Sequence, residues 1–267
     1  MMEVDTLKLM LPLDYVKDIN YSKFEQHGKH LTQRSNGIET TNKLIVKGID
    51  YGLNQIIIDD LMETVTLHTT AKLLKDDYKR SVSYNTIDQF TDAINSHNYI
   101  KIESRNLLRS DVQIVDPVKT ISLNDIDNSA RSIISISSMN NRYDVRPHIT
   151  TTSLGWSAKR KVKSYHERQI GYSKLHDLNK DTHNRNFAKA YPKMAASFKL
   201  NDIRIESSLK SLATIRDRCN IDKSGLKPIL SDVLSSDQNV NLKIFNRIVS
   251  TGRQMDLFNN HFIDLDM

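Results

Sequence analysis

The sequence predicts an α+β fold, with a largely antiparallel central sheet, flanking helices and a small helical region at the C-terminal end. Short segments of alternating polar and apolar residues recur along the chain, which is typical of strands with one buried face. Between them lie stretches whose apolar residues have helical spacing. A hydrophobic fraction of 38% over 267 residues is that of a folded protein and argues against disorder.

The N-terminal part of the chain is rich in predicted strands. Residues 6–13 alternate and contain a proline near their end, as a strand terminus allows. Residues 44–58 predict two short strands around a glycine turn, and the β-branched segment 63–70 predicts another. Two more strands are expected over 99–103 and 110–116.

Two helices are predicted in the middle of the chain. One covers 85–97, where Asn85 can act as the N-cap, and the other covers 123–136 after Ser122. Residues 137–150 are polar and rich in turn formers, so we expect a loop or lid there.

The last third of the chain alternates again. One long strand, bent at Gly171, is expected over 159–176, and a strand over 203–206. Helices are predicted over 183–194, interrupted near Pro192, and over 211–219, 228–234 and 241–250. The predicted boundaries are those of a first domain at 1–220 and a C-terminal helical region at 221–267.

Several functional classes lack support in the sequence. No apolar run approaches the length of a spanning helix, and the N-terminus has no signal-peptide pattern, so we expect a cytoplasmic protein without a membrane partner. Cys219 is the single cysteine and predicts a packed thiol. No phosphate-binding glycine motif occurs. Trp156 is interpreted as a core or strand-edge residue rather than a base-stacking one.

The positive charge is concentrated in one segment. The net charge is +6, yet residues 156–218 hold 15 basic and 6 acidic side chains, a net of +9. Clustered Lys and Arg side chains can neutralise backbone phosphates, because each contact releases condensed counterions. This segment therefore indicates where a nucleic acid would bind, although a solvated basic face explains the charge equally well.

Three segments together suggest phosphoryl transfer. Asp111 and Glu206 each lie in a predicted strand, and Tyr172 is followed at strand spacing by Lys174 and His176. A neighbouring cation favours the phenolate, and carboxylates suit Mg²⁺ or Mn²⁺. If these side chains meet across one sheet, the tyrosine can attack a phosphate polarised by the metal. The simpler interpretation of each residue alone is structural.

Four short motifs occur in order over nearly all of residues 5–220: Leu7-Lys8-Leu9-Met10-Leu11-Pro12; Arg109 with Asp111; Tyr172 with Lys174, Asp177 and Leu178; and Arg204 with Glu206 and Lys210. In this order the chain resembles rolling-circle replication initiators of the filamentous-phage gene II type and the related trans-acting plasmid initiators. The resemblance implies a diverged replication-initiator endonuclease fold that nicks and religates DNA through a 5′-phosphotyrosyl intermediate.

The resemblance also implies roles for residues. Tyr172 would be the nucleophile, Lys174 would assist the phenolate or phosphate, and Asp111 and Glu206 would hold Mg²⁺ or Mn²⁺. The implied DNA-binding residues are Lys159, Arg160, Lys161, Lys163, Arg204 and Lys210. The implied partners are single-stranded or supercoiled origin DNA and the replication machinery of a bacterial host, with a homodimer left open.

Three departures from the family pattern keep alternatives open. No His-x-His pair occurs, and Asp177 stands where a glutamate is expected. Tyr165 is a rival nucleophile on the same predicted strand, facing the opposite way unless a bulge intervenes. The alternative function is a non-catalytic, sequence-specific DNA-binding regulator with the same fold, and a third is a protein-interaction module.

Overall fold

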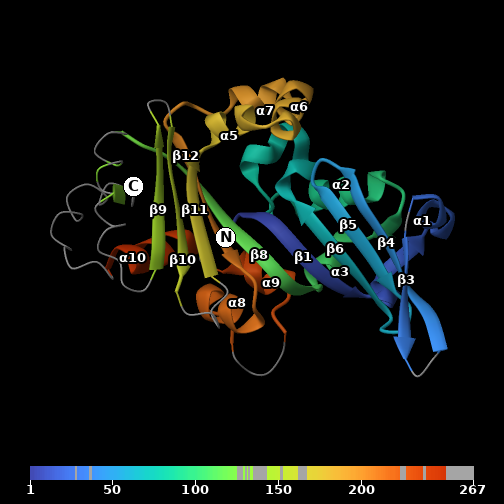
Figure 1. Cartoon of the computed structure of the whole chain (residues 1–267). Helices are drawn as coiled ribbons and strands as arrows, with labels where there is room; N and C mark the ends of the chain where they lie inside the picture. The colour runs from blue at the N-terminus through green and yellow to red at the C-terminus, as the bar shows by residue number, and fades with distance from the viewer. Residues whose placement is uncertain are drawn as a thin grey trace. The chain divides into compact units, whose positions relative to one another are not determined.

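The computed structural model describes residues 1–27, 29–35, 38–124, 129, 131, 133–134, 143–150, 153–161, 167–222, 227–236 and 239–250 (Figure 1). The chain forms two compact units. The first combines Met1–Asp116 with Lys210–Asp237, and the second combines Pro117–Leu209 with Gln238–Met267. These boundaries differ from the predicted division after residue 220, so the extent of a catalytic domain stays a prediction.

The first unit contains a sheet in which every neighbouring pair of strands is antiparallel. Its spatial order is β3 (Lys29–Ser35), β4 (Ile38–Asp50), β5 (Leu53–Asp59), β6 (Thr64–Thr70) and β1 (Val4–Pro12). Strand β8 (Asp111–Ser122) begins in this unit and ends in the second. The predicted strands near 6–13, 44–58 and 63–70 are confirmed, with Gly52 at φ +93° in the β4–β5 turn.

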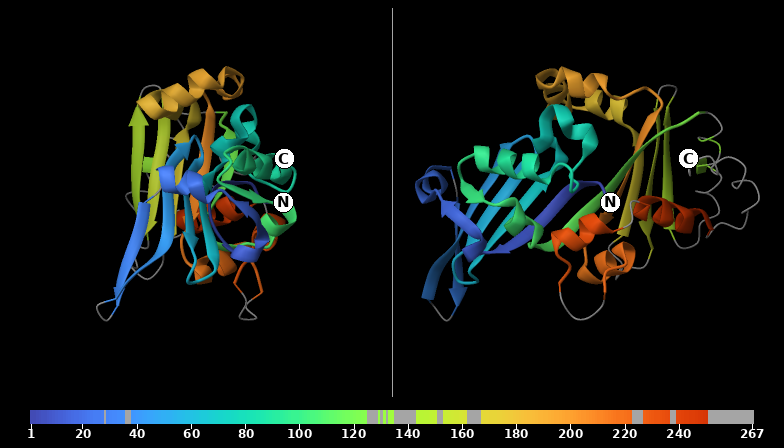
Figure 2. Two further views of the ribbon diagram at one scale, coloured as in Figure 1. Left: turned by 90° about the vertical axis from the view of Figure 1, so that its right-hand side faces the viewer. Right: turned by 180° about the vertical axis from the view of Figure 1, so that it is seen from behind.

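One face of this sheet is buried and the other is partly exposed. In β1, Leu7, Leu9 and Leu11 are fully buried and alternate with half-buried residues, as the period of two requires. The helices η2 (Ala71–Arg80), α2 (Ile87–Ser96) and α3 (Ser104–Leu108) lie together on one side of the strands in Figure 2. The apolar residues of the alternating strands therefore lie on the face of the sheet that the helices cover.

The first unit also contains a small two-stranded sheet and further helices. Strand β2 (Val16–Ile19) pairs with β7 (Ile100–Ile102). The helical segments are η1 (Leu13–Tyr15), α1 (Tyr21–His27), α8 (Leu212–Cys219) and α9 (Leu230–Ser235). None of the described helices is both long and apolar enough to cross a membrane.

Two predicted helix starts in this unit need correction. The N-cap of α2 is Thr86 instead of Asn85. Helix α9 begins at Leu230 instead of 228, because the Pro228 carbonyl accepts a hydrogen bond from the Val112 amide and holds the chain extended. Cys219 ends α8 as a buried residue, and burial raises the pKa of its thiol to about 12, which keeps it protonated and inert.

The second unit has an antiparallel sheet with helices. Its strands follow the order β12 (Asp202–Leu209), β11 (Glu167–Ser173), β10 (Ser153–Arg160) and β9 (Tyr143–Thr150). The helices are α5 (Lys174–Lys180), α6 (Thr182–Ala190), α7 (Pro192–Ala196) and α10 (Val240–Ser250). The fold class is therefore α+β with largely antiparallel sheets, as predicted.

The single long strand predicted over 159–176 is wrong. Strand β10 ends at Arg160, β11 begins at Glu167, and helix α5 begins at Lys174. Lys174 and Leu178, four residues apart, are both buried, which is helical spacing, and Asp177 pairs with Lys174 within the first turn. His176 consequently lies on a helix and does not share the strand face of Tyr172.

The loop or lid predicted over 137–150 is also wrong where the structure describes it. Residues 143–150 form β9, in which the buried Tyr143 and Val145 alternate with exposed residues. Residues 137–142 and most of the predicted helix 123–136 lie outside the described residues. Ser122 ends β8, and its hydroxyl donates a hydrogen bond to the Asp202 carboxylate at 2.5 Å.

Trp156 is a core residue of the second unit. On β10 it pairs with Gly171 of β11, and its ring centroid lies 5.4 Å from that of Phe245 on α10. A Cβ built on Gly171 would lie 2.2 Å from a carbon of the indole. Gly171 is therefore required by close packing, and the bend predicted there is absent, since β11 continues to Ser173.

We predict that Gly171→Ala lowers the free energy of unfolding by about 1–3 kcal/mol, because the new methyl group overpacks the core against the indole. Denaturant unfolding of the purified protein measures the change. In a Trp156→Leu background the six-membered ring is gone, so the same substitution should cost less. An equal cost in both backgrounds would contradict the packing explanation.

Candidate active site around Tyr172

Strand register places Tyr172 on the sheet face opposite the Trp156 core. Within β11 the residues Gln169, Gly171 and Ser173 are buried, whereas Tyr172 is half-buried. Tyr172 pairs with Arg204 of β12, and Ile170 pairs with Glu206. Side chains of paired residues lie on the same face, so Tyr172, Arg204 and Glu206 meet there.

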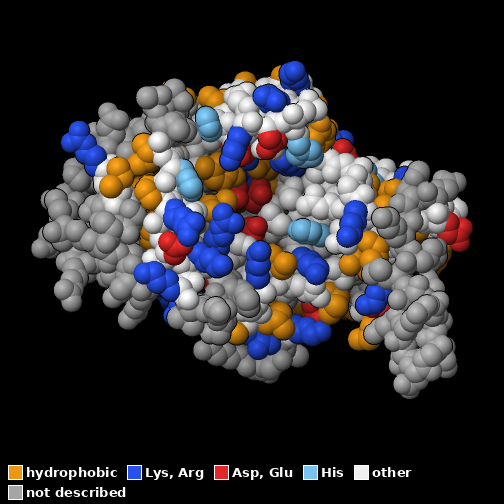
Figure 3. Space-filling view, viewed as in Figure 1, with side chains coloured by type: hydrophobic (Ala, Val, Ile, Leu, Met, Phe, Trp, Pro, Cys, Tyr) orange, Lys and Arg blue, Asp and Glu red, His pale blue; other side chains and the backbone are white. Residues whose placement is uncertain are grey.

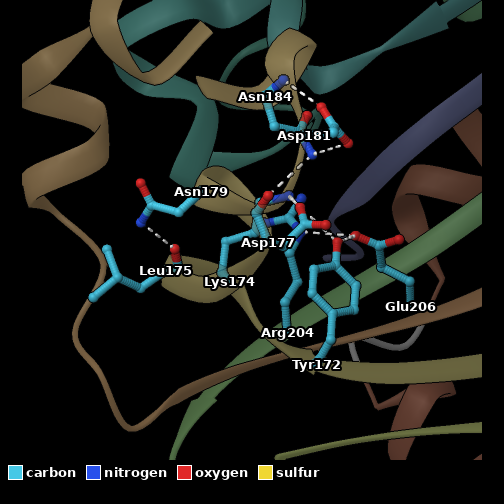
Figure 4. A network of polar contacts seen from close by, with 9 residues as sticks. All are labelled: Tyr172, Lys174, Leu175, Asp177, Asn179, Asp181, Asn184, Arg204 and Glu206. Carbon is cyan, nitrogen blue, oxygen red and sulfur yellow. Dashed lines mark hydrogen bonds and ion pairs between the residues drawn. The ribbon is translucent and has the colours of Figure 1, made fainter. Parts of the chain in front are cut away.

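A polar network surrounds the phenol (Figure 4). The Tyr172 hydroxyl donates a hydrogen bond to Glu206 Oε1, which also accepts one from Arg204 Nε at 3.0 Å. Lys174 Nζ lies 3.4 Å from the Tyr172 hydroxyl oxygen and 2.9 Å from Asp177 Oδ2. The phenol thus touches a carboxylate that can accept its proton and an ammonium that can stabilise the resulting anion.

The two cations of this network are buried and paired. The side chains of Arg204 and Lys174 are 0% and 3% exposed, and each forms an ion pair, with Glu206 and Asp177 respectively. Buried charges are tolerated when they are paired and hydrogen-bonded. The Lys174 ammonium also lies 5.1 Å from the centroid of the Tyr172 ring, within the range of a cation–π contact.

An open groove of about 690 Å³ lies beside Tyr172. It is lined by residues of β9, β10, β11 and α5, among them His148, Gly155, Arg168, His176 and Lys180. Gly155 has no room for a side chain, because a Cβ there would lie 2.9 Å from the Gly171 carbonyl oxygen. The groove therefore reaches the backbone at Gly155 and carries basic and imidazole groups along its lining.

Cationic side chains share this side of the sheet with Tyr172. By register and alternation, Arg146 of β9, Lys159 of β10 and Arg168 of β11 lie on the same face as Tyr172, which we call the tyrosine face. Figure 3 shows Lys, Arg and His side chains gathered over strands β9–β11. Asp144 lies on the same face and forms an ion pair with Arg146, so its negative charge is neutralised by one of these cations.

The predicted DNA-binding residues have different fates. Lys159 and Lys161 are exposed and Arg160 is half-buried, whereas Lys163 and the rival nucleophile Tyr165 lie outside the described residues. The DNA-binding role predicted for Arg204 needs correction. Its side chain is fully buried and paired with Glu206, so its charge is not presented at the surface. Lys210 is exposed and belongs to the first unit.

The two predicted metal ligands belong to different units. Glu206 is in the second unit, and Asp111 begins β8 in the first, where its carboxylate pairs with Lys227 at 3.1 Å. Among the described residues, no group of three or more His, Cys, Asp and Glu side chains is placed to hold a metal ion. A single carboxylate such as Glu206 still suits Mg²⁺ when substrate phosphates and water complete the coordination.

Sequence reasoning missed Arg168 and His148 as groove residues. Arg168 precedes Tyr172 by four positions on one strand, so the period of two already placed both on one face. His148 had no such signal, because its strand contains Pro147 and turn-forming neighbours that favoured a loop.

The sequence matches no protein-family model, and no curated protein matches it. Among solved structures, the chain is similar to a rolling circle replication initiator protein from Geobacillus stearothermophilus. The sequence identity is 10% and the TM-score is 0.34, with 94% of this chain and 98% of that chain covered.

We predict that Arg204→Met destabilises the protein by about 3–5 kcal/mol, because it leaves the Glu206 carboxylate, which is only 13% exposed, without its guanidinium partner. The double variant Arg204→Met/Glu206→Gln should recover part of that loss, since no unpaired charge remains. Thermal or denaturant unfolding of the single and double variants measures both. A double variant no more stable than Arg204→Met would contradict a buried ion pair.

Proposed function

We propose that this chain is a DNA strand transferase that nicks and religates one DNA strand, with Tyr172 as the nucleophile. The observation that carries the proposal is the contact of one phenol with both the Glu206 carboxylate and the Lys174 ammonium at the edge of a basic groove. A nucleophile hydrogen-bonded to a base and flanked by a cation is the arrangement that activates a hydroxyl.

The chemical step follows from these contacts. Glu206 accepts the phenol proton, and the Tyr172 oxygen attacks the phosphorus of a phosphodiester. The new bond joins the tyrosine to the 5′ phosphate while the bond to the 3′ oxygen breaks, and that oxygen takes up a proton from water. The reverse reaction, attack by the 3′ hydroxyl, restores the DNA strand and the free tyrosine.

Lys174 and Arg204 have separate parts in this step. The Lys174 ammonium is close enough to stabilise negative charge on the phenolate oxygen, and its own position is fixed by Asp177. Arg204 is buried below the site and fixes the Glu206 carboxylate, so it is a positioning residue. Because both cations are held before DNA binds, little reorganisation is needed when the charge moves.

Backbone phosphates of the DNA would lie along the tyrosine face. Lys159 and Arg168 lie on adjacent strands as register partners, and Lys180 lines the groove from α5. Contacts of this kind hold the DNA in register without reading its sequence. The role in initiating rolling-circle replication, with origin DNA and host replication proteins as partners, belongs to the same proposal.

A divalent ion, Mg²⁺ or Mn²⁺, is part of the proposal. Glu206 would be the ligand from the second unit, and Asp111 is the second ligand that the sequence predicts. When bound, the ion would polarise the scissile phosphate. The hydrogen bond from Tyr172 and the ion pair with Arg204 both use Glu206 Oε1, and in this proposal that oxygen accepts the phenol proton.

The first test is covalent capture. Single-stranded and supercoiled DNA containing the replicon's origin is incubated with the protein and Mn²⁺, and the denatured products are separated by mass. We expect a protein–DNA adduct from the parent chain and from Tyr165→Phe, and none from Tyr172→Phe. An adduct that persists in Tyr172→Phe would contradict the assignment. DNA binding without any adduct would favour the non-catalytic regulator.

Glu206→Gln tests the proton-accepting role. Loss of the general base should slow adduct formation roughly a hundredfold to ten-thousandfold. Rates are measured over a series of Mn²⁺ concentrations. A defect that high Mn²⁺ fully repairs would show that Glu206 acts as a metal ligand instead.

A further inference from the structure

A row of polar side chains crosses the open face of the sheet in the first unit. Strand register aligns Lys8 of β1 with His68 of β6, His68 with Gln55 of β5, and Gln55 with Lys47 of β4. Neighbouring residues on a strand point to opposite faces, and Leu7, Leu67, Ile56 and Val46 beside this row are buried on the helix side. The four polar side chains therefore share the face that the helices leave open.

The charge of this row is positive and uncompensated within the described part of the chain. Neither Lys8 nor Lys47 forms an ion pair with a described residue. Asp59, an acid on the same face, already pairs with Lys43 at 2.9 Å. Figure 3 shows Lys and His side chains over these strands. A polyanion would meet two lysines here without an opposing carboxylate.

The positive region continues past the edge of β1. Lys210 lines a cavity of about 370 Å³ together with Met10, which is two residues from Lys8 on β1. Asp111 and Lys227 line the same cavity and form an ion pair with each other, so the charge of Lys210 remains in excess there. The pKa of His68 is lowered, first by burial and then by the charges of Lys8 and Lys210. At neutral pH His68 is therefore an uncharged hydrogen-bonding group, and the lysines supply the charge.

We propose that this face is a second DNA-binding surface, in which Lys8 and Lys47 contact backbone phosphates and Gln55 and His68 form hydrogen bonds between them. The choice of DNA as the polyanion rests on the proposed function. All residues of this surface belong to the first unit, whereas the residues of the tyrosine face belong to the second.

The dimensions of the row suit a nucleic acid backbone. Adjacent strands lie about 4.8 Å apart, so the four strands place Lys8 and Lys47 roughly 14 Å from each other. That is on the order of the width of the major groove of B-DNA, and several phosphates of a single strand also fit within it. Thr66 and Thr70 on β6 are half-buried on this face and add hydroxyl groups beside the row.

The test uses binding and needs no chemistry. In the Tyr172→Phe chain, which removes cleavage, Lys8→Gln/Lys47→Gln is compared with Lys8→Arg/Lys47→Arg. The matched control is Lys75→Gln/Arg80→Gln, which removes two exposed cations from η2 on the helix side. Fluorescence anisotropy of a labelled 20-base-pair duplex and of a labelled single strand is measured over a series of salt concentrations.

We expect Lys8→Gln/Lys47→Gln to weaken binding roughly tenfold and to reduce the slope of log K against log salt by about 2, because two phosphate contacts are lost. The arginine pair and the η2 control should bind like the parent. The probe that shows the loss, duplex or single strand, identifies the form of DNA that occupies the face.

Unchanged affinity and slope for both probes would overturn the inference, and so would an equal loss in the η2 control. The outcome is separate from that of the proposed function. If no adduct forms at Tyr172 but binding depends on Lys8 and Lys47, the proposed catalysis fails and this surface stands. If an adduct forms at Tyr172 but Lys8 and Lys47 have no effect on binding, the proposed catalysis stands and this surface fails.

Discussion

The buried ion pair between Arg204 and Glu206 is the interaction on which the candidate site depends. A guanidinium with no exposed surface needs a partner, and Glu206 supplies it two residues further along β12. Because the two side chains lie on one face of one strand, their pairing fixes the carboxylate at the place where the neighbouring strand presents Tyr172. The stability of the fold and the position of the carboxylate beside Tyr172 therefore depend on the same ion pair. The free-energy cost of burying the charges is offset only while both Arg204 and Glu206 remain.

The sheet of the second unit serves two purposes on its two faces. On one face, Trp156 packs across Gly171 and against Phe245, which makes a dense apolar layer. On the other face the same strands carry Tyr172 and the cations that surround it. The glycine lets the indole approach the backbone closely, so the strand that bears Tyr172 is supported from behind by a rigid aromatic group. Dense packing of this kind limits the movement of the strand.

Much of the fold could be predicted from the sequence, and the failures have physical causes. Strand alternation near the N-terminus and helical spacing near the C-terminus identified β1, β6, α8 and α10, because each element buries one apolar face. The prediction of a long strand around Lys174 was wrong, because the pattern of Tyr172, Lys174 and His176 fits a strand and the start of a helix equally well. The sequence placed Tyr172 and Glu206 on strands that could meet across one sheet, and the register of β11 and β12 brings them together. The burial of Arg204 could not be predicted, because a single sequence does not show that a guanidinium lies under a sheet.

The change from strand to helix directly after Ser173 gives the site an economical construction. The phenol is the last outward-facing residue of β11, and the ammonium that faces it comes from the first residue of α5, with its carboxylate partner one turn later. The phenol, the ammonium and its counter-ion are thus encoded within six consecutive residues. A loop insertion or a shift elsewhere in the chain leaves their mutual geometry intact, so only the supply of a carboxylate from β12 has to be maintained by the tertiary fold.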